Sequence, residues 1–192
     1  MLGHDTGFML NGDHVGFYGA IKERFLRGLA PQLKQIRLGI AEHIGVDPER
    51  VVMGGDPGTI IEDMFPAGII VRLPHVVQSY FLNPHFDKYL DADQIKNRLP
   101  SCKDSRMVGF TLMLQMPSDG AALWWWQFPT PAMYGRTLLF AEEYKVGHFV
   151  SVHEDMLHSI APWEMRLGWL DPPRVTMQMF ALRCDGVFYV FH

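Results

Sequence analysis

The sequence predicts one mainly β domain, a sandwich or jelly roll with helices packed outside it. Hydrophobic residues make up 48% of the 192 residues and charged residues 20%, which is an ordinary globular balance in a chain that fits one domain. The first part of the chain carries a helical repeat of apolar residues. From about residue 68, short apolar runs alternate with Pro, Gly, Asp and Asn, which favours many short strands. Strands that follow a helical segment indicate packed sheets with helices outside.

Residues 1–66 are the expected helical support segment of this single domain, and residues 67–192 are its jelly-roll core. Apolar residues recur every three or four positions between Phe17 and Ile44, which makes one stripe along a helix. Pro31 is expected to divide this segment into two helices or to kink it. The stripe keeps its phase across Pro31, so both pieces should pack on one surface. A second, short helix is expected at about Asp91–Arg98.

Strands are expected where apolar runs lie between turn-forming residues. Because side chains alternate along a strand, Arg174, Thr176 and Gln178 share one polar face. A polar face that carries an arginine, late in a β domain, is either solvated surface or the inside of a binding cavity. The expected strands are Gly68–Arg72, Val76–Leu82, Met107–Met116, Ala122–Phe128, Thr137–Phe140, His148–Val152, His158–Ile160, Arg174–Leu182 and Val187–Phe191.

Composition predicts a cytoplasmic protein. The start of the chain lacks the basic region and apolar run of a secretory signal, and no apolar stretch approaches the roughly 20 residues that span a bilayer. Cys102 and Cys184 cannot make a disulfide framework, so a reducing compartment is the default and both thiols are expected to be inert. The net charge of −4 gives no sequence-wide attraction to nucleic acid or membrane, and neither is expected as a partner.

Nine histidines beside two cysteines favour a metal site made of imidazole and carboxylate. In His85-Phe86-Asp87, the i, i+2 spacing points an imidazole and a carboxylate to one side of extended backbone. These residues would supply two ligands of the 2-His-1-carboxylate triad that holds non-haem Fe(II) and leaves positions open. His158 is the candidate for the second histidine.

Other interpretations of the histidines stay open. A His-x-Asp triplet alone is more often a surface hydrogen bond than a metal site. His153-Glu154-Asp155 is a second such triplet, but with His158 it would place all three ligands within six residues and leave His85 unexplained. The remaining histidines are expected to be satisfied by ordinary hydrogen bonds or to lie at the surface or the termini: His4, His14, His43, His75, His148 and His192.

The order of these residues resembles the double-stranded β-helix oxygenases that depend on Fe(II) and 2-oxoglutarate. The resemblance covers about residues 70–183 and includes His-x-Asp, a long β stretch, His158-Ser-Ile-Ala-Pro and Arg174-Val-Thr. Ser118–Leu123 resembles the family's strand–Asp-Gly-Gly-x-Leu segment, although Ala121 replaces the second glycine. Tyr144–Val150 resembles the turn before the second histidine. The fold implied is a jelly roll flanked by helices.

The resemblance implies that His85, Asp87 and His158 bind Fe(II), and that Arg174 with Thr176 binds the distal carboxylate of 2-oxoglutarate. Guanidinium is the best bidentate partner for a carboxylate, which agrees with this assignment. Arg166 is the substitute if Arg174 is not the anchor. The implied activity is a dioxygenase that oxidises a substrate C–H bond and yields succinate and CO2. Hydroxylation is the default outcome, although desaturation or ring formation would use the same residues. A carboxylate at position 87 separates the chain from the halogenating branch, where Gly or Ala replaces it.

The expected substrate is a small molecule, such as an amino acid or a natural-product acid, with O2 as co-substrate and a monomer or homodimer as the assembly. Arg72, Gln78 and Tyr80 precede the metal triplet and are candidates to line the cavity. Trp124 and Trp126 share one strand face, which is either a pocket wall or core packing.

Two rival functions remain at this point. One is a cupin-like iron oxygenase that does not use 2-oxoglutarate, which would not need the polar face of Arg174 and Thr176. The other is a non-catalytic β-barrel binding protein in which the His-Asp-His combination is coincidental.

Overall fold

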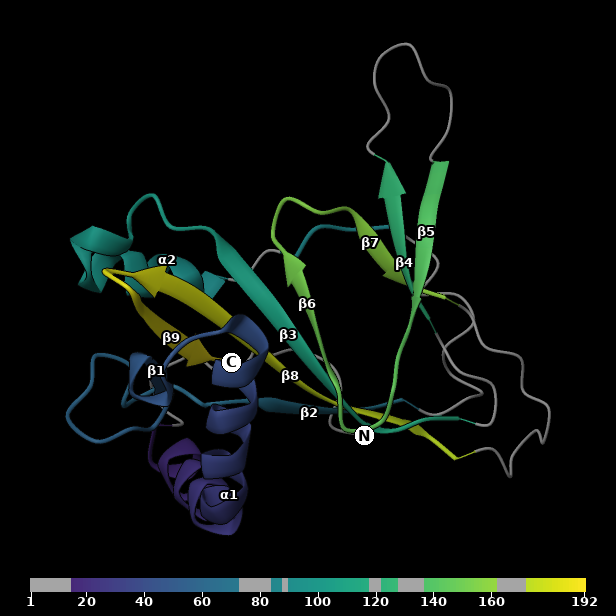
Figure 1. Ribbon diagram of the computed structural model, residues 1–192. Coiled ribbons are helices and arrows are strands. Elements are labelled where there is room, and N and C mark those ends of the chain that lie inside the picture. Colours follow the sequence, from purple (N-terminus) through teal and green to yellow (C-terminus); the bar gives the residue numbers. More distant parts are fainter. Residues whose placement is uncertain (1–14, 73–83, 88–89, 118–121, 128–136, 162–171) are drawn as a thin grey trace.

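The protein is described by a computed structural model that covers residues 15–72, 84–87, 90–117, 122–127, 137–161 and 172–192. The described part is mainly β, with two sheets and few helices (Figure 1). Its elements are α1 (Val15–Ile44), β1 (Val51–Met53), β2 (Gly68–Arg72), α2 (Leu90–Arg98), β3 (Met107–Gln115), β4 (Ala122–Gln127), β5 (Thr137–Glu143), β6 (Phe149–His153), β7 (His158–Ile160), β8 (Arg174–Cys184) and β9 (Val187–Phe191), with 3-10 turns η3 (Pro48–Arg50) and η5 (Pro100–Cys102).

The large sheet has the strand order β1-β9-β8-β3-β6, and β2 pairs with β8 beside it. The long strand β8 has two partners on the same edge: β2 pairs with its first half and β9 with its second half. All these pairs are antiparallel except β1–β9, which is parallel. The small sheet has the order β5-β4-β7, and the β4–β5 hairpin projects from the body of the molecule (Figure 1).

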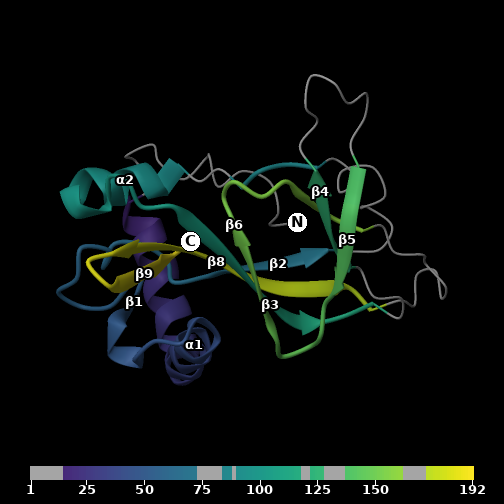
Figure 2. The ribbon, with the colours of Figure 1, turned by 45° about the horizontal axis from the view of Figure 1, so that its top comes forward.

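Helices α1 and α2 lie on opposite sides of the large sheet, as Figures 1 and 2 show. The face toward α1 buries Phe110 of β3 and Met179 of β8 against Ile36 and Ile40 of the helix. These two helical residues belong to the predicted apolar stripe, which is therefore confirmed over this half of the helix. The helix runs unbroken through Pro31, so the alternative of two separate helices is wrong.

The other face of the large sheet meets the small sheet. Met113 of β3 and Val152 of β6 pack there against Leu123 and Trp125 of β4. The residues that alternate with the α1-facing ones on β3 and β8 therefore point into the space between the two sheets. This inner face is where the predicted polar side chains of β8 lie.

Most predicted strands agree with the structure to within two or three residues, including both edges of Gly68–Arg72, His158–Ile160 and Val187–Phe191. The predicted strand Val76–Leu82 lies outside the described residues. Strand β1 is a correction, because residues 1–66 were expected to be helical support. Val51, Val52 and Met53 form a strand only because they pair with β9, far away in the sequence.

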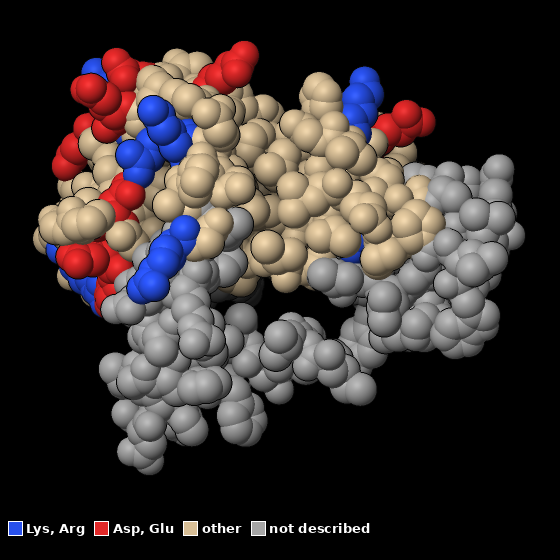
Figure 3. All heavy atoms as spheres, turned by 90° about the horizontal axis from the view of Figure 1, so that it is seen from below, with Lys and Arg blue, Asp and Glu red and all other residues tan. Residues whose placement is uncertain are grey.

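A groove of about 500 Å³ lies on the α1 side of the large sheet, between Gln35, Ile69, Leu114 and Met177. In Figure 3, most charged side chains gather over the end that holds α1 and β1, whereas the middle of this surface is uncharged. The groove is on the face opposite to the inner polar residues, so it is separate from the site described below. No helix in the described ranges is long and apolar enough to cross a lipid bilayer.

The cysteines differ from expectation. Cys102 and Cys184 were predicted to be separate, inert thiols, but the structure joins them in a disulfide with a Cα–Cα distance of 4.9 Å. The turn η5 and the end of β8 meet in a hydrophobic cluster that includes Ile95 of α2. A pair 82 residues apart gives no local signal in the sequence. The argument for a reducing compartment rested on unpaired cysteines, so it loses its support.

Candidate metal centre

His85 and His158 are held together by their backbones. His85 N donates to the carbonyl of His158 at 2.8 Å, and His158 N donates to the carbonyl of His85 at 3.0 Å. These reciprocal bonds form an isolated antiparallel bridge, which places both side chains on the same side. Their ring centroids are 4.6 Å apart. His85 and His158 are 73 positions apart in the sequence. They meet because the His85 segment pairs with the edge of β7.

Asp87 completes the cluster above a glycine of β3. Its Oδ1 lies 3.7 Å from Nε2 of His158 and 3.9 Å from Nε2 of His85. A β-carbon built on Gly109 would lie 3.0 Å from Oδ2 of Asp87, so the carboxylate occupies the space that a side chain at position 109 would fill. Asp87 is mostly buried, with 14% of its side chain exposed, whereas His85 is 51% exposed. The cluster is therefore open toward His85 and closed toward the large sheet.

The buried member of the cluster, His158, presents its Nε2 to Asp87 in a fixed tautomer. Its Nδ1 lies 3.0 Å from the carbonyl oxygen of Met156, which can only accept, so Nδ1 carries the proton. Burial lowers the pKa of His158, whereas the Met156 carbonyl and the charge of Asp87 oppose this shift and His85 adds to it. A neutral imidazole with a free Nε2 lone pair is the form that binds a metal.

One ligand atom from each of His85, Asp87 and His158 lies within 4.8 Å of the other two. The oxygen–nitrogen distances of 3.7 and 3.9 Å are too long for hydrogen bonds. Bonds of about 2.0–2.2 Å, as zinc makes to His and carboxylate, would let one ion contact both atoms of such a pair. The residues present therefore fit a metal ion bound by two imidazoles and one carboxylate.

Arg174 is a second buried charge on the inner face. Its side chain is 2% exposed, and its guanidinium lies over the ring of Tyr144 at 4.9 Å. Burial lowers the pKa of Arg174, while the neighbouring Tyr144 opposes the shift and hydrogen-bonds to it. Nε of Arg174 has no hydrogen-bond partner, and no carboxylate lies at ion-pair distance, among the described residues. A buried charge of this kind requires an anionic partner.

Register places the two charged groups on one face. Gly109, which underlies Asp87, is opposite Phe180 on β8, and Met113 is opposite Thr176. Residues separated by even numbers share a face, so the carboxylate and Thr176 lie on the same side of the sheet. Arg174 belongs to this series, and Thr176 is also 2% exposed. Arg174 and Thr176 of the polar face predicted from the sequence are thus buried between the sheets, whereas Gln178 is half-buried.

The three tryptophans of β4 divide between two faces. Trp125 is opposite His158 in the β4–β7 register and shares its face. Trp124 and Trp126, the candidates for substrate contact, lie on the other face: Trp126 Nε1 donates to Oγ of Ser159 at 2.8 Å, and Trp124 is opposite Ser159. Trp124 and Trp126 therefore lie away from His158. Any pocket that they line is not on the side of the candidate metal ligands.

Several predicted residues are placed only in part or not at all. Arg72 pairs with Arg174 in the β2–β8 register, but its side chain lies outside the described part. Gln78, Tyr80 and Arg166 also fall outside the described residues, so the alternative anchor Arg166 has no position here.

The second His-x-Asp triplet is not part of the cluster. His153 is opposite Val108, on the α1 side of the large sheet, and it is exposed. Asp155 forms an exposed ion pair with Arg106. The structure therefore separates this triplet from His85 and Asp87.

Three residues next to the candidate ligands and anchor were missed as site residues. Trp125 contacts the His158 side through strand register, which no local pattern reveals. Gly109 leaves space for the Asp87 carboxylate, but this role depends on a contact between segments that are distant in the sequence. Tyr144 lies in the predicted turn segment Tyr144–Val150 and has no periodic signal of its own. Searches against protein-family models, curated proteins and solved structures found no match to this chain.

Proposed function

We propose that this chain is an Fe(II)- and 2-oxoglutarate-dependent dioxygenase with a double-stranded β-helix core. The strand order supports this fold. Counted from β2, with His85 as the second segment, the first, third, sixth and eighth β segments are in the large sheet. The second, fourth, fifth and seventh are in the small sheet. Eight antiparallel segments distributed over two facing sheets are expected of a jelly roll.

The observation that carries the proposal is the His85, Asp87 and His158 cluster on the same inner face as a buried arginine. Two imidazoles and one carboxylate are the donor set of non-haem Fe(II) oxygenases, and three protein ligands leave positions for other molecules. Gly109 leaves room for Asp87, and the Met156 carbonyl fixes the tautomer of His158.

The buried guanidinium of Arg174 supports 2-oxoglutarate as the co-substrate. Its Nε has no partner among the described residues, and Thr176 offers a hydroxyl on the same strand face. A carboxylate entering between the sheets would pair with this charge in a bidentate geometry. Tyr144 stacks against the guanidinium and would hold its plane in place. A cupin-like iron enzyme without 2-oxoglutarate would have no use for this buried cation.

The roles of the residues follow from these positions. Fe(II) with 2-oxoglutarate and O2 supplies the oxidising power for a C–H bond, with succinate and CO2 as co-products. His85, Asp87 and His158 would hold the ion, while Arg174 and Thr176 would orient the co-substrate by its distal carboxylate. The two sheets exclude water from His158 and Arg174, which are 6% and 2% exposed. The proposed substrate is a small molecule that is hydroxylated.

Anaerobic titration with Fe(II) and then 2-oxoglutarate tests the proposal. A weak visible charge-transfer band should appear on addition of 2-oxoglutarate, and succinate should form when O2 is admitted. Asp87→Ala should lose metal binding and both signals. Asp155→Ala removes the matching carboxylate of the other His-x-Asp triplet and should keep them. Metal binding without the band or succinate would favour the cupin-like alternative, and no metal binding by the folded protein would favour a non-catalytic binding protein.

A further inference from the structure

The disulfide joins the turn that follows α2 to the end of β8. Cys102 ends the turn η5 and is 0% exposed, and Cys184 ends β8 and is 2% exposed. Both sulfurs belong to a hydrophobic cluster that also contains Ile95 of α2 and Leu182 of β8. The bridge therefore joins the chain segment around α2 to the central strand of the large sheet.

This segment is connected to the metal ligands at both of its ends. Helix α2 begins at Leu90, three residues after Asp87. Strand β3 begins at Met107, five residues after Cys102, and brings Gly109 against the Asp87 carboxylate. The position of Asp87 thus depends on how the chain between it and β3 is anchored, and the disulfide is a covalent anchor within that stretch.

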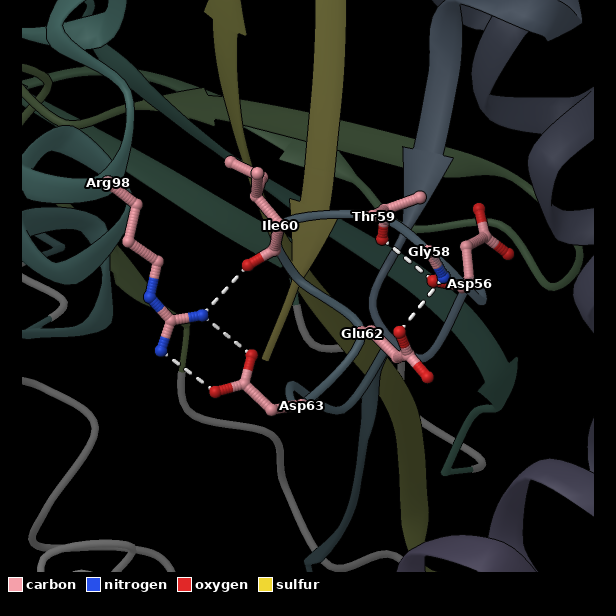
Figure 4. Close-up of polar contacts among 7 residues, drawn as sticks. All are labelled: Asp56, Gly58, Thr59, Ile60, Glu62, Asp63 and Arg98. Carbon is pink, nitrogen blue, oxygen red and sulfur yellow. Dashed lines mark hydrogen bonds and ion pairs between the residues drawn. The ribbon is translucent and has the colours of Figure 1, made fainter.

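The other described polar contacts of this segment are non-covalent and weaker than the disulfide. Arg98 of α2 makes two hydrogen bonds to the carboxylate of Asp63 and one to the carbonyl of Ile60 (Figure 4). Both charged side chains are exposed, at 37% and 62%, and exposed ion pairs contribute little. Ser105 Oγ donates to the carbonyl of Arg183 beside the bridge. Opening the disulfide would leave the segment with the core packing of Ile95 and Leu99, the exposed Arg106–Asp155 ion pair and these surface contacts.

We propose that the Cys102–Cys184 bridge is a redox-controlled support of the metal centre, with high metal affinity when it is closed and lower affinity when it is open. The inference rests on the proposed metal site. Closing occurs by thiol–disulfide exchange with a small-molecule disulfide such as oxidised glutathione. The two protein thiols lose two electrons and two protons and form one S–S bond. The S–S bond of the small molecule breaks, and its two sulfurs take up the electrons and protons as thiols.

Linkage makes this coupling reciprocal. If closing the bridge strengthens metal binding tenfold, the metal must favour the closed bridge by the same factor. For this two-electron couple, a tenfold factor shifts the reduction potential of the disulfide by about 30 mV, toward more negative values when metal is bound. Because both sulfurs are buried, exchange requires local opening around η5, so it should be slow compared with exchange at an exposed disulfide.

Co(II) alone is the probe for the test. We compare the oxidised protein with the variant Cys102→Ala/Cys184→Ala, which mimics the open bridge and needs no reductant. The dissociation constant for Co(II) should rise about tenfold, within the range known for groups that support metal ligands. Asp63→Asn removes the charge that pairs with Arg98 and leaves the sulfurs intact, so its dissociation constant for Co(II) should stay within twofold of that of the oxidised protein.

The outcomes separate this inference from the proposed function. If no form binds Co(II), the metal site itself is wrong. If the oxidised protein and the double alanine variant bind Co(II) equally, or if the folded protein keeps two free thiols after equilibration with oxidised glutathione, the redox inference is overturned. Hydrogen exchange should show lost protection confined to residues 90–106 and 183–187 in the variant. Global unfolding would also overturn it, because the bridge would then be needed for the whole fold.

Discussion

Trp125 and His158 face each other across β4 and β7, with ring centroids 6.2 Å apart. On its other side Trp125 stacks on Phe140 of β5, at 5.7 Å and an interplanar angle of 30°. With His85, these rings form a row across the small sheet that begins at the candidate metal ligands and ends at the exposed edge strand. The indole is thus close enough to report on what binds at the site.

Binding of Co(II) should quench the fluorescence of Trp125, because a metal with visible absorption bands would lie beside a ligand that the indole contacts. In Trp125→Phe most of this quenching should disappear. Trp124→Phe is the matched control, since Trp124 lies on the opposite face of the same strand. Loss of quenching in Trp124→Phe with full quenching in Trp125→Phe would contradict the placement of the metal.

Arg174→Ala should weaken 2-oxoglutarate binding by about 10- to 100-fold, because charge-assisted hydrogen bonds contribute about 1.5–3 kcal/mol. Arg174→Lys should recover only part, since an ammonium cannot form the bidentate pair. The measurement is the 2-oxoglutarate dependence of the anaerobic charge-transfer band, with Fe(II) affinity as the internal control. The anchor assignment is wrong if Arg174→Ala binds normally and Arg166→Ala does not bind.

Gly109→Ala should weaken metal binding by about tenfold or more while leaving the protein folded. The new β-carbon would lie 3.0 Å from Oδ2 of Asp87 and 3.5 Å from the ring of Phe180, so the carboxylate must move. Gly28→Ala is the control, because nothing lies within 4 Å of a β-carbon at this helical position. That change should raise stability by up to about 1 kcal/mol and leave metal affinity unaltered. Calorimetric titration measures the metal affinity, and thermal unfolding measures the stability. Equal metal affinity in both variants would contradict the proposal that Gly109 makes room for the Asp87 carboxylate.

Stability should fall as pH decreases below about 6.5, in part through His192. Burial lowers the pKa of His192, so the unfolded chain binds its proton more readily than the folded protein does. The stability that neutral His192 contributes is fully present above the ordinary histidine pKa. It is lost as the pH falls toward and through the lowered pKa of His192 in the folded protein. The imidazole packs on Phe180, with ring centroids 6.1 Å apart, and approaches the backbone of Gly68.

Urea unfolding of His192→Gln at pH 7.5 and 5.5 measures this effect. The variant should lose less free energy of unfolding between the two pH values than the parent protein. Gly28→Ala, which removes no titratable group, should keep the slope of the parent. An unchanged slope in His192→Gln would contradict the assignment.

Local patterns in the sequence were enough to predict much of the geometry of the candidate metal centre. The i, i+2 spacing of His85 and Asp87 places both on one side of extended backbone, and the structure brings them within reach of His158. The alternation in β8 separated Arg174 and Thr176 from the apolar face that packs on α1. These predictions succeeded because period-two alternation is a property of the strand itself.

What the sequence did not predict depends on long-range partners. Val51–Met53 is too short for a periodic signal, and only its pairing with β9 makes it a strand. Cys102 and Cys184 meet because η5 and the end of β8 share a core, which spacing alone does not reveal. The register between β4 and β7, which the sequence does not reveal, places Trp125 on the same side as His158.

The parallel pair of β1 and β9 has a consequence for how the protein is made. Residues 51–53 pair with residues 188–190, so β1 has no strand partner until most of the described chain has left the ribosome. The large sheet must therefore be completed late, after synthesis of β9. Pairings this distant in sequence make folding slow and expose unpaired edges in the meantime. During translation, the apolar side chains of α1 stay exposed until β3 and β8, which cover them, have been synthesised.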